Sequence, residues 1–252
     1  IVVLSILLIS FSEIFAAVVT STSTGGNWSS TSTWLGGVVP AGSDVVIIST
    51  TGGNTVLVDA NTASIQSLTI NSGAILTCNS NVTLSVGKGT GVDIVNNGTM
   101  QFTNGTLKLA NNSSWDGSGN WNLYNLDLGG RTLLISFSTY DTVHISGGSD
   151  PITNGGTLSP GTNSIFDFNG TSSQDFPLDN NISFYDVQFN NASGVNLTRN
   201  ISTGTVAGNL SISSGTVSMA GFTMTGNAGK SFIMNASTTL NCNVTFPSGF
   251  ST

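Results

Sequence analysis

Short runs in which apolar and polar residues alternate recur along the chain, and nearly every run ends at Gly, Asn, Asp or Pro. Early runs are Val45–Ile48, Thr55–Val58, Ser67–Ile70 and Ala74–Thr77, and residues 208–229 repeat the style as "GNLSISSGTVSMAGFTMTGNAG". A side chain on every second position facing one side is typical of a half-buried strand, and Gly or Asn marks tight turns. The pattern therefore predicts consecutive strands of three to five residues.

Stacked coils explain this pattern best. One coil of short strands cannot bury its own apolar face, whereas stacking many coils makes a continuous core of Val, Ile, Leu and Phe. Gly and Asn supply the left-handed corner conformations at least cost. We predict an all-β protein, a parallel β-helix (β-solenoid) with an N-terminal cap. A β-sandwich pair is the alternative, although its turns are typically spaced 8–12 residues apart and those of this chain recur faster.

The two ends of the sequence suggest how this fold is divided. Residues 1–17, "IVVLSILLISFSEIFAA", match the apolar region and small-residue cleavage site of a secretory signal peptide, incomplete because no basic segment precedes it; a membrane anchor or an assembly strand remains an alternative. We expect residues 18–26 to be a linker, 27–120 to form the opening and first coils, and 121–252 to continue the solenoid beyond Thr252. Because of this leader, the chain is expected to be secreted or displayed on the cell surface. No later segment is long and apolar enough to span a bilayer.

Charge is scarce in the 252 residues. Charged residues make up 7% of the chain, against roughly 25% in ordinary soluble domains, and the net charge of −7 includes only five Lys and Arg. A basic patch for phosphate backbones therefore has no source, which excludes nucleic acid as a partner. The two cysteines, Cys78 and Cys242, stand in similar phrases, which suggests one structural position used twice. In a solenoid they would lie too many coils apart for a disulfide.

The segment from Asn27 to Thr77 resembles the eight-glycine domain found at the amino end of several extracellular β-helix proteins. The resemblance rests on "NWSSTSTW" with Trp28 and Trp34, on Gly36-Gly37, on "VPAGSDVVI", and on "NTVLVD" followed by "SIQSLTINSGAIL". It implies an extracellular β-helix and, in some relatives, association with polysaccharide. We expect the two tryptophans to cover the first coil; sugar stacking by them is the alternative.

Residues that could carry chemistry are few. The densest acidic group is a candidate cation or sugar site: Asp167, Asp175, Asp179 and Asp186. With coils of about twenty residues, Asp167 and Asp186 would lie one above the other on adjacent coils, although corner aspartates in Asx turns explain them as well. Candidate carbohydrate-stacking residues are Trp115, Trp121, Tyr124 and Tyr185.

His144 is the only histidine, and Asp141, three residues before it, faces the opposite side of a strand. No zinc constellation, paired carboxylates or phosphate loop accompanies it. We therefore expect no catalytic residue, no metal and no cofactor. The sequence predicts an extracellular structural or adhesive β-solenoid; a carbohydrate-binding module of a larger secreted protein, and a polysaccharide lyase or glycoside hydrolase, are the alternatives.

Overall fold

The alternating runs form strands in which every second side chain is buried. In β3 (Val45–Ile48), β5 (Ser67–Ile70) and β6 (Ile75–Cys78), the second and fourth residues are buried and the others are half-buried. Successive side chains of a strand point to opposite faces, so each strand contributes two residues to the interior. The repeated pattern therefore lines one continuous core.

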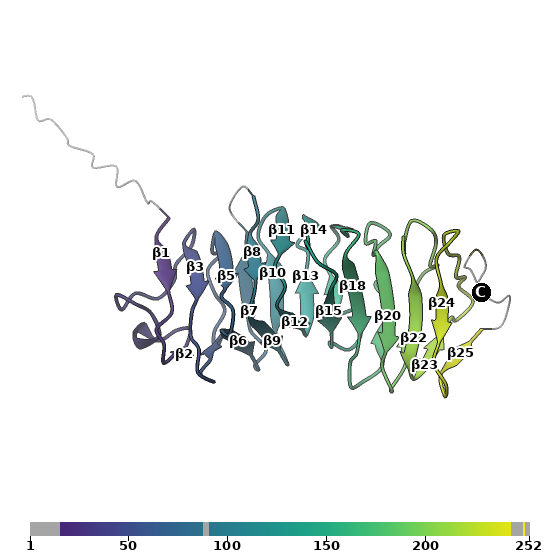
Figure 1. Ribbon diagram of the computed structural model, residues 1–252, viewed down its shortest axis with the longest axis horizontal. Coiled ribbons are helices and arrows are strands. Elements are labelled where there is room, and N and C mark those ends of the chain that lie inside the picture. Colours follow the sequence, from purple (N-terminus) through teal and green to yellow (C-terminus); the bar gives the residue numbers. More distant parts are fainter. Residues whose placement is uncertain (1–15, 88–90, 243–248, 250–252) are drawn as a thin grey trace, which may run out of the picture.

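The computed structural model describes residues 16–87, 91–242 and 249, and they form an elongated parallel β-solenoid (Figure 1). Its longest sheet has ten strands, one from each coil. All strand ladders between the named strands are parallel. The predicted parallel β-helix is confirmed, and the β-sandwich alternative is wrong because a sandwich is built from antiparallel ladders.

Each coil contributes strands to up to three faces. The seven-stranded sheet contains β1 (Val18–Thr20), β3, β5, β8 (Ile94–Asn96), β11 (Ser113–Asp116), β14 (Thr132–Ile135) and β17 (Thr157–Ser159). The ten-stranded sheet contains β2 (Gly26–Asn27), β4 (Val56–Leu57), β6, β9 (Thr99–Phe102), β12 (Asn120–Leu123), β15 (Asp141–Ile145), β18 (Ser164–Phe168), β20 (Asp186–Asn190), β22 (Leu210–Ser214) and β24 (Phe232–Met234).

Two four-stranded sheets form the remaining faces. The first contains β7 (Thr83–Val86), β10 (Thr106–Leu109), β13 (Asn125–Asp127) and β16 (Ile152–Thr153). The second contains β19 (Gln174–Asp175), β21 (Val195–Asn196), β23 (Thr216–Ser218) and β25 (Thr239–Asn241). The predicted division at 120/121 falls inside β12, and one solenoid runs through both segments.

A cap covers the first strand. After β2 and the short 3-10 helix η1 (Thr31–Thr33), Trp34 pairs antiparallel with Ser21, and the Leu35 amide donates to the Thr20 carbonyl at 2.9 Å. The rings of Trp28 and Trp34 pack edge to face, 4.9 Å between centroids, and both are buried. The expected covering role of the tryptophans is confirmed. Their use as sugar platforms is wrong, because their faces are closed to solvent.

Residues 18–26 are not a linker. Val18–Thr20 is strand β1, whose residues pair in register with Val45, Val46 and Ile47 of β3, and residue 26 begins β2. The Ser/Thr/Gly composition is typical of a linker, but β1 is a strand because it forms hydrogen bonds with β3, about 27 residues later in the chain. Of the predicted signal peptide, residues 1–15 lie outside the described residues.

The two cysteines occupy different faces. Cys78 ends β6 in the ten-stranded sheet and is buried, whereas Cys242 follows β25 in the second four-stranded sheet and is half-buried. The interpretation of one position used twice is therefore wrong, while the separation by several coils agrees with their being unpaired. Within the described part of the chain, no helix is long and apolar enough to cross a membrane.

Candidate functional site

The outer face of the ten-stranded sheet carries a row of polar side chains along the solenoid. The parallel register places Gln101 opposite Asn122, Asn122 opposite His144, His144 opposite Asp167, and Asp167 opposite Gln188. Coils are spaced about 4.8 Å apart, so the row offers one polar group per coil. Gln101, Asn122, His144 and Gln188 alternate with buried neighbours such as Trp121 and Val143 and face outward, whereas Asp167, in the same row, is itself buried.

A groove of about 300 Å³ lies over β9, β12 and β15 and reaches the corner after β18. We call it the polar groove; its lining is Gln101, Phe102, Thr103, Asn122, Leu123, Tyr124, His144, Ser146, Asn169 and Thr171. Amides and hydroxyls predominate, and none of these side chains is a carboxylate. The polar groove therefore presents hydrogen-bond donors and acceptors almost without net charge.

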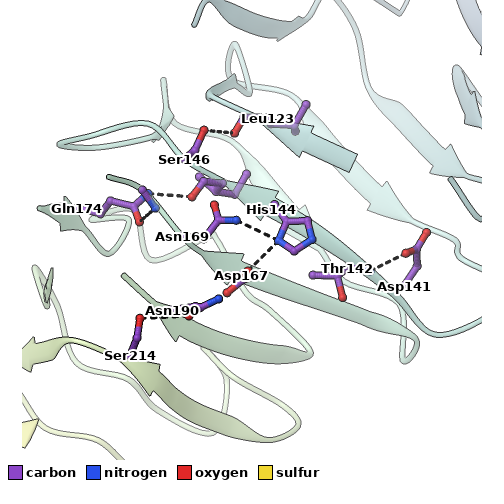
Figure 2. Close-up of polar contacts among 12 residues, drawn as sticks. Leu123, Asp141, Thr142, His144, Ser146, Asp167, Asn169, Gln174, Asn190 and Ser214 are labelled. Atoms are coloured by element: carbon purple, nitrogen blue, oxygen red, sulfur yellow. Dashed lines mark hydrogen bonds and ion pairs between the residues drawn. The ribbon is translucent and has the colours of Figure 1, made fainter. Parts of the chain in front are cut away.

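His144 is held in the polar groove by a carboxylate from the next coil. Its Nδ1 lies 2.7 Å from Oδ2 of Asp167, and the Asn169 side-chain nitrogen lies 3.2 Å from the same Nδ1 (Figure 2). The Asp167 side chain is 1% exposed, whereas that of His144 is 36% exposed. Because Nδ1 is engaged by Asp167, Nε2 is the ring nitrogen left to accept a proton or a hydrogen bond from a ligand.

Two oxygen atoms of the residues that contact His144 have no hydrogen-bond partner. Oδ1 of Asp167 and Oδ1 of Asn169 are buried and make no hydrogen bond. Buried polar atoms are normally paired, and an unpaired one costs free energy until a water or ligand satisfies it. Both oxygens are closed to solvent, so this unused hydrogen-bonding capacity lies next to His144 and not on the open surface of the polar groove.

Asp141 lies near His144 without pairing with it directly. Its Oδ1 accepts a hydrogen bond from the Thr142 amide at 2.8 Å. Burial raises the pKa of the Asp141 carboxyl, while the Thr142 amide, the Trp121 indole and the charge of His144 act in the opposite direction. The sequence correctly set Asp141 aside as the His144 partner, and it missed Asp167. The sequence did contain a signal for this contact: His144 and Asp167 are 23 residues apart, which is about one coil.

The four predicted acidic residues do not form one site. Asp167 stands opposite Gln188, and Ile165 stands opposite Asp186, so the expected stacking of Asp167 on Asp186 is wrong by two positions although the coils are adjacent. Asp186 is buried, with contacts to the Tyr140 hydroxyl and, at 2.6 Å, to the Asn209 amide.

The other two aspartates lie on other parts of the surface. Asp175 belongs to β19 in the second four-stranded sheet and accepts a hydrogen bond from Asn196 at 3.0 Å. Asp179 accepts one from the Asn181 amide at 2.9 Å, in the local manner of an Asx turn. Among the described residues, no group of three or more His, Cys, Asp or Glu side chains could hold a metal ion.

The aromatic candidates divide into core and surface. Trp115 and Trp121 are fully buried and stack on each other with centroids 5.2 Å apart, so their assignment as carbohydrate platforms is wrong. Tyr124 lines the polar groove. Tyr185 lies elsewhere, with Lys230 Nζ 5.1 Å from its ring centroid and 3.2 Å from its hydroxyl. Of the four, Tyr124 is the one that the structure brings to His144.

Comparison of the chain with family models, with curated proteins and with solved structures gives no match. The resemblance of residues 27–77 to the eight-glycine domain therefore stays a prediction. What the geometry itself offers is an outward array of uncharged hydrogen-bonding groups and one imidazole oriented by one buried carboxylate.

Proposed function

We propose that this protein is an extracellular structural or adhesive rod whose polar groove binds a polysaccharide. The observation that carries the proposal is the polar groove itself, with its amides and hydroxyls arranged at coil spacing around Tyr124 and His144. Neutral sugars offer hydroxyl groups that both donate and accept, and they recognise such a lining without any need for charge.

The rest of the molecule suits a rod. Its backbone groups pair from coil to coil along ten strands of the longest sheet, which leaves few edges for proteases or unwanted pairing. The antiparallel contact of Trp34 with Ser21 protects the amino-terminal edge. The apolar residues 1–17 and the resemblance to the eight-glycine domain support the extracellular location.

A matched pair on one strand tests the binding. Asn122 lines the polar groove, whereas Asn120 lies on the same face of β12 outside it. We expect a glycan array to show polysaccharide binding by the intact chain, about tenfold weaker binding by Asn122→Ala, and unchanged binding by Asn120→Ala. The proposal fails if the intact chain binds no glycan, or if both variants lose binding equally.

The contact between His144 and Asp167 favours a second candidate function, cleavage of a uronate-containing polysaccharide by β-elimination. In that reaction Nε2 of His144 takes the C5 proton, the C4–O4 bond breaks, a C4=C5 double bond forms, and the leaving O4 takes a proton from the Tyr124 hydroxyl. Asp167 would act by holding the imidazole with Nε2 free.

The two candidate functions are separated by the fate of the polysaccharide. Elimination creates an unsaturated uronate that absorbs in the ultraviolet, whereas binding leaves the polymer intact. The catalytic candidate requires absorbance to rise with the intact chain and to stop with His144→Gln, which keeps a polar side chain in the polar groove. A bound, uncleaved polymer would leave the adhesive rod as the function.

A further inference from the structure

Arg199 is a buried cation that forms no ion pair with a carboxylate in the described part of the chain. It follows β21 in the turn that leads toward β22, and 6% of the residue is exposed. Its Nη2 donates to the Ile182 carbonyl, and its Cζ lies 5.4 Å from the centroid of the Phe176 ring. The ion pairs among the described residues are Lys108 with Asp127 and His144 with Asp167, so none involves Arg199.

Such an arrangement costs free energy. Nε of Arg199 is buried and has no hydrogen-bond partner. Burial lowers the pKa of the guanidinium, while the charge of Asp179 raises it; an arginine nevertheless stays protonated in proteins. A buried charge is normally compensated by a counter-charge, and no carboxylate of the described residues lies within ion-pair distance of Arg199.

Arg199 is one of the residues that line a pocket large enough to admit a small anion. The pocket has a volume of about 590 Å³, and its other lining residues are Asn180, Asn200, Ser202, Gly204, Thr205 and Phe222. Amides and hydroxyls can donate hydrogen bonds, and no carboxylate is among these residues. Asp179 lies beside the pocket rather than in its lining, and its Oδ1 is engaged by the Asn181 amide.

The hydroxyls of the pocket are placed by the turn that precedes Val206. Ser202 Oγ and Thr205 Oγ1 lie 3.1 Å apart, and the Thr205 amide donates to the Ser202 carbonyl at 2.9 Å. Thr205 is 6% exposed, so this lining residue is largely closed to solvent. A pair of hydroxyls in a pocket that Arg199 also lines suits the oxygens of one small anion.

We propose that this pocket, the Arg199 pocket, binds an oxyanion: a carboxylate, sulfate or phosphate group of an anionic ligand. It is a different site from the polar groove, because its lining belongs to residues 180–222 whereas the polar groove is lined by residues 101–171. A planar guanidinium pairs with two oxygens of either a carboxylate or a tetrahedral anion.

Calorimetric titration with sodium sulfate, sodium phosphate and sodium glucuronate tests the proposal, with sodium chloride at equal ionic strength as the reference. We expect saturable heat for at least one of the three anions. The order of affinity among them distinguishes a carboxylate ligand from a tetrahedral one. The proposal is overturned if no anion gives heat beyond that of chloride.

Two arginine variants locate the binding. Arg199→Met keeps an apolar stem near Phe176 and removes the charge, and about tenfold or greater loss of affinity is expected because the charge-assisted hydrogen bonds to the anion are lost. Arg131→Met, at an exposed arginine, should leave the affinity unchanged. Equal affinities of the intact chain and of Arg199→Met would overturn the proposal.

A measurement on the intact chain covers the case in which Arg199→Met does not fold. Nitrogen NMR during the sulfate titration should move the Arg199 side-chain signals and the Thr205 amide with one dissociation constant. Shifts centred on other residues would contradict the assignment. Polysaccharide binding at the polar groove is read separately by Asn122→Ala, so failure of either proposal is distinguishable from failure of the other.

Discussion

His144 and Asp167 stand opposite each other on adjacent coils, with Nδ1 and Oδ2 2.7 Å apart. A buried carboxylate of one coil thereby orients the imidazole of the coil before it. The parallel register alone creates this contact, since the two residues are 23 positions apart in the chain. The pair defines the chemical centre of the polar groove.

The first prediction concerns the imidazole tautomer. In the intact chain at neutral pH, we expect the proton of neutral His144 to reside on Nδ1, because Asp167 accepts it. Asp167→Asn removes the negative acceptor, so the Nε2-protonated tautomer should increase. Nitrogen NMR of the single histidine measures both forms directly. Asp141→Asn serves as the control, since Asp141 makes no direct contact with the ring, and an equal change in both variants would contradict the geometry.

The second prediction concerns the four tryptophans. Trp28, Trp34, Trp115 and Trp121 are all buried, with exposures of 0–3%. Acrylamide should therefore quench their fluorescence several-fold less in the folded chain than after denaturation, and polysaccharide should leave the emission wavelength unchanged. Strong quenching of the folded chain would mean that at least one indole is open to solvent.

The third prediction concerns corner glycines. Gly215 has φ of 76°, and a Cβ built on it would lie 1.8 Å from the Asn191 carbonyl oxygen of the preceding coil. Gly215→Ala should therefore lower the free energy of unfolding by about 3 kcal/mol or more, from backbone strain plus overpacking. Denaturant titration measures the loss.

Gly221 provides the matched control for this steric effect. Its φ is 90°, and nothing lies within 4 Å of a Cβ built on it. Gly221→Ala should cost about 1–2 kcal/mol, the strain of a left-handed alanine alone. Similar losses for the two variants would show that coil-to-coil contact at Gly215 is looser than the structure indicates.

The fourth prediction uses two aspartates whose pKa values move in opposite directions. For Asp141, burial raises the pKa above the ordinary value of 3.8, so the folded chain holds this proton more tightly than the unfolded chain. The stabilisation of the folded chain by protonated Asp141 is complete below pH 3.8 and is lost as the pH rises through the folded-state pKa. Asp141→Asn should therefore gain stability relative to the intact chain at neutral pH, and the gain should shrink on acidification.

The pKa of Asp59 is lowered instead of raised, so its effect on stability has the opposite pH dependence. Burial raises its pKa, but hydrogen bonds from the Ser29 hydroxyl at 2.6 Å and from the Ser29 amide at 3.0 Å lower it, and the net pKa lies below 3.8. The ionised Asp59 carboxylate therefore stabilises the folded chain above pH 3.8, and this stabilisation is lost as the pH falls through the folded-state pKa. Asp59→Asn should be less stable than the intact chain at neutral pH. Parallel pH profiles of unfolding for the two variants would contradict both assignments.

Much of the fold could be predicted because its causes are local. Alternation in Val45–Ile48 and Ser67–Ile70 sets which side chains enter the core, and the corner residues between runs force a turn. The same alternation contained a signal that the sequence interpretation overlooked. Trp121 stands between the polar Asn120 and Asn122 and is therefore an inward position, which excludes it as a sugar platform.

The candidate site could be predicted only in part. Tyr124 was expected to face a ligand and does line the polar groove, and Asp167 was singled out among the acidic residues, but with Asp186 as its companion. The assumed coil length caused that error. Partners along the ten-stranded sheet are 20 residues apart between Val56 and Leu76, and 30 residues apart between Gly26 and Val56.

The sequence by itself determined the fold class of this protein. Short strands, inward apolar residues and Gly or Asn corners specify a stacked parallel β-solenoid, because each of these features depends on residues that are neighbours in the chain. Tertiary structure alone decided which residues of successive coils meet. A corner that gains or loses one residue shifts the register of the next strand, and that register placed His144 against Asp167 and left Arg199 buried with no carboxylate of the described residues in ion-pair distance.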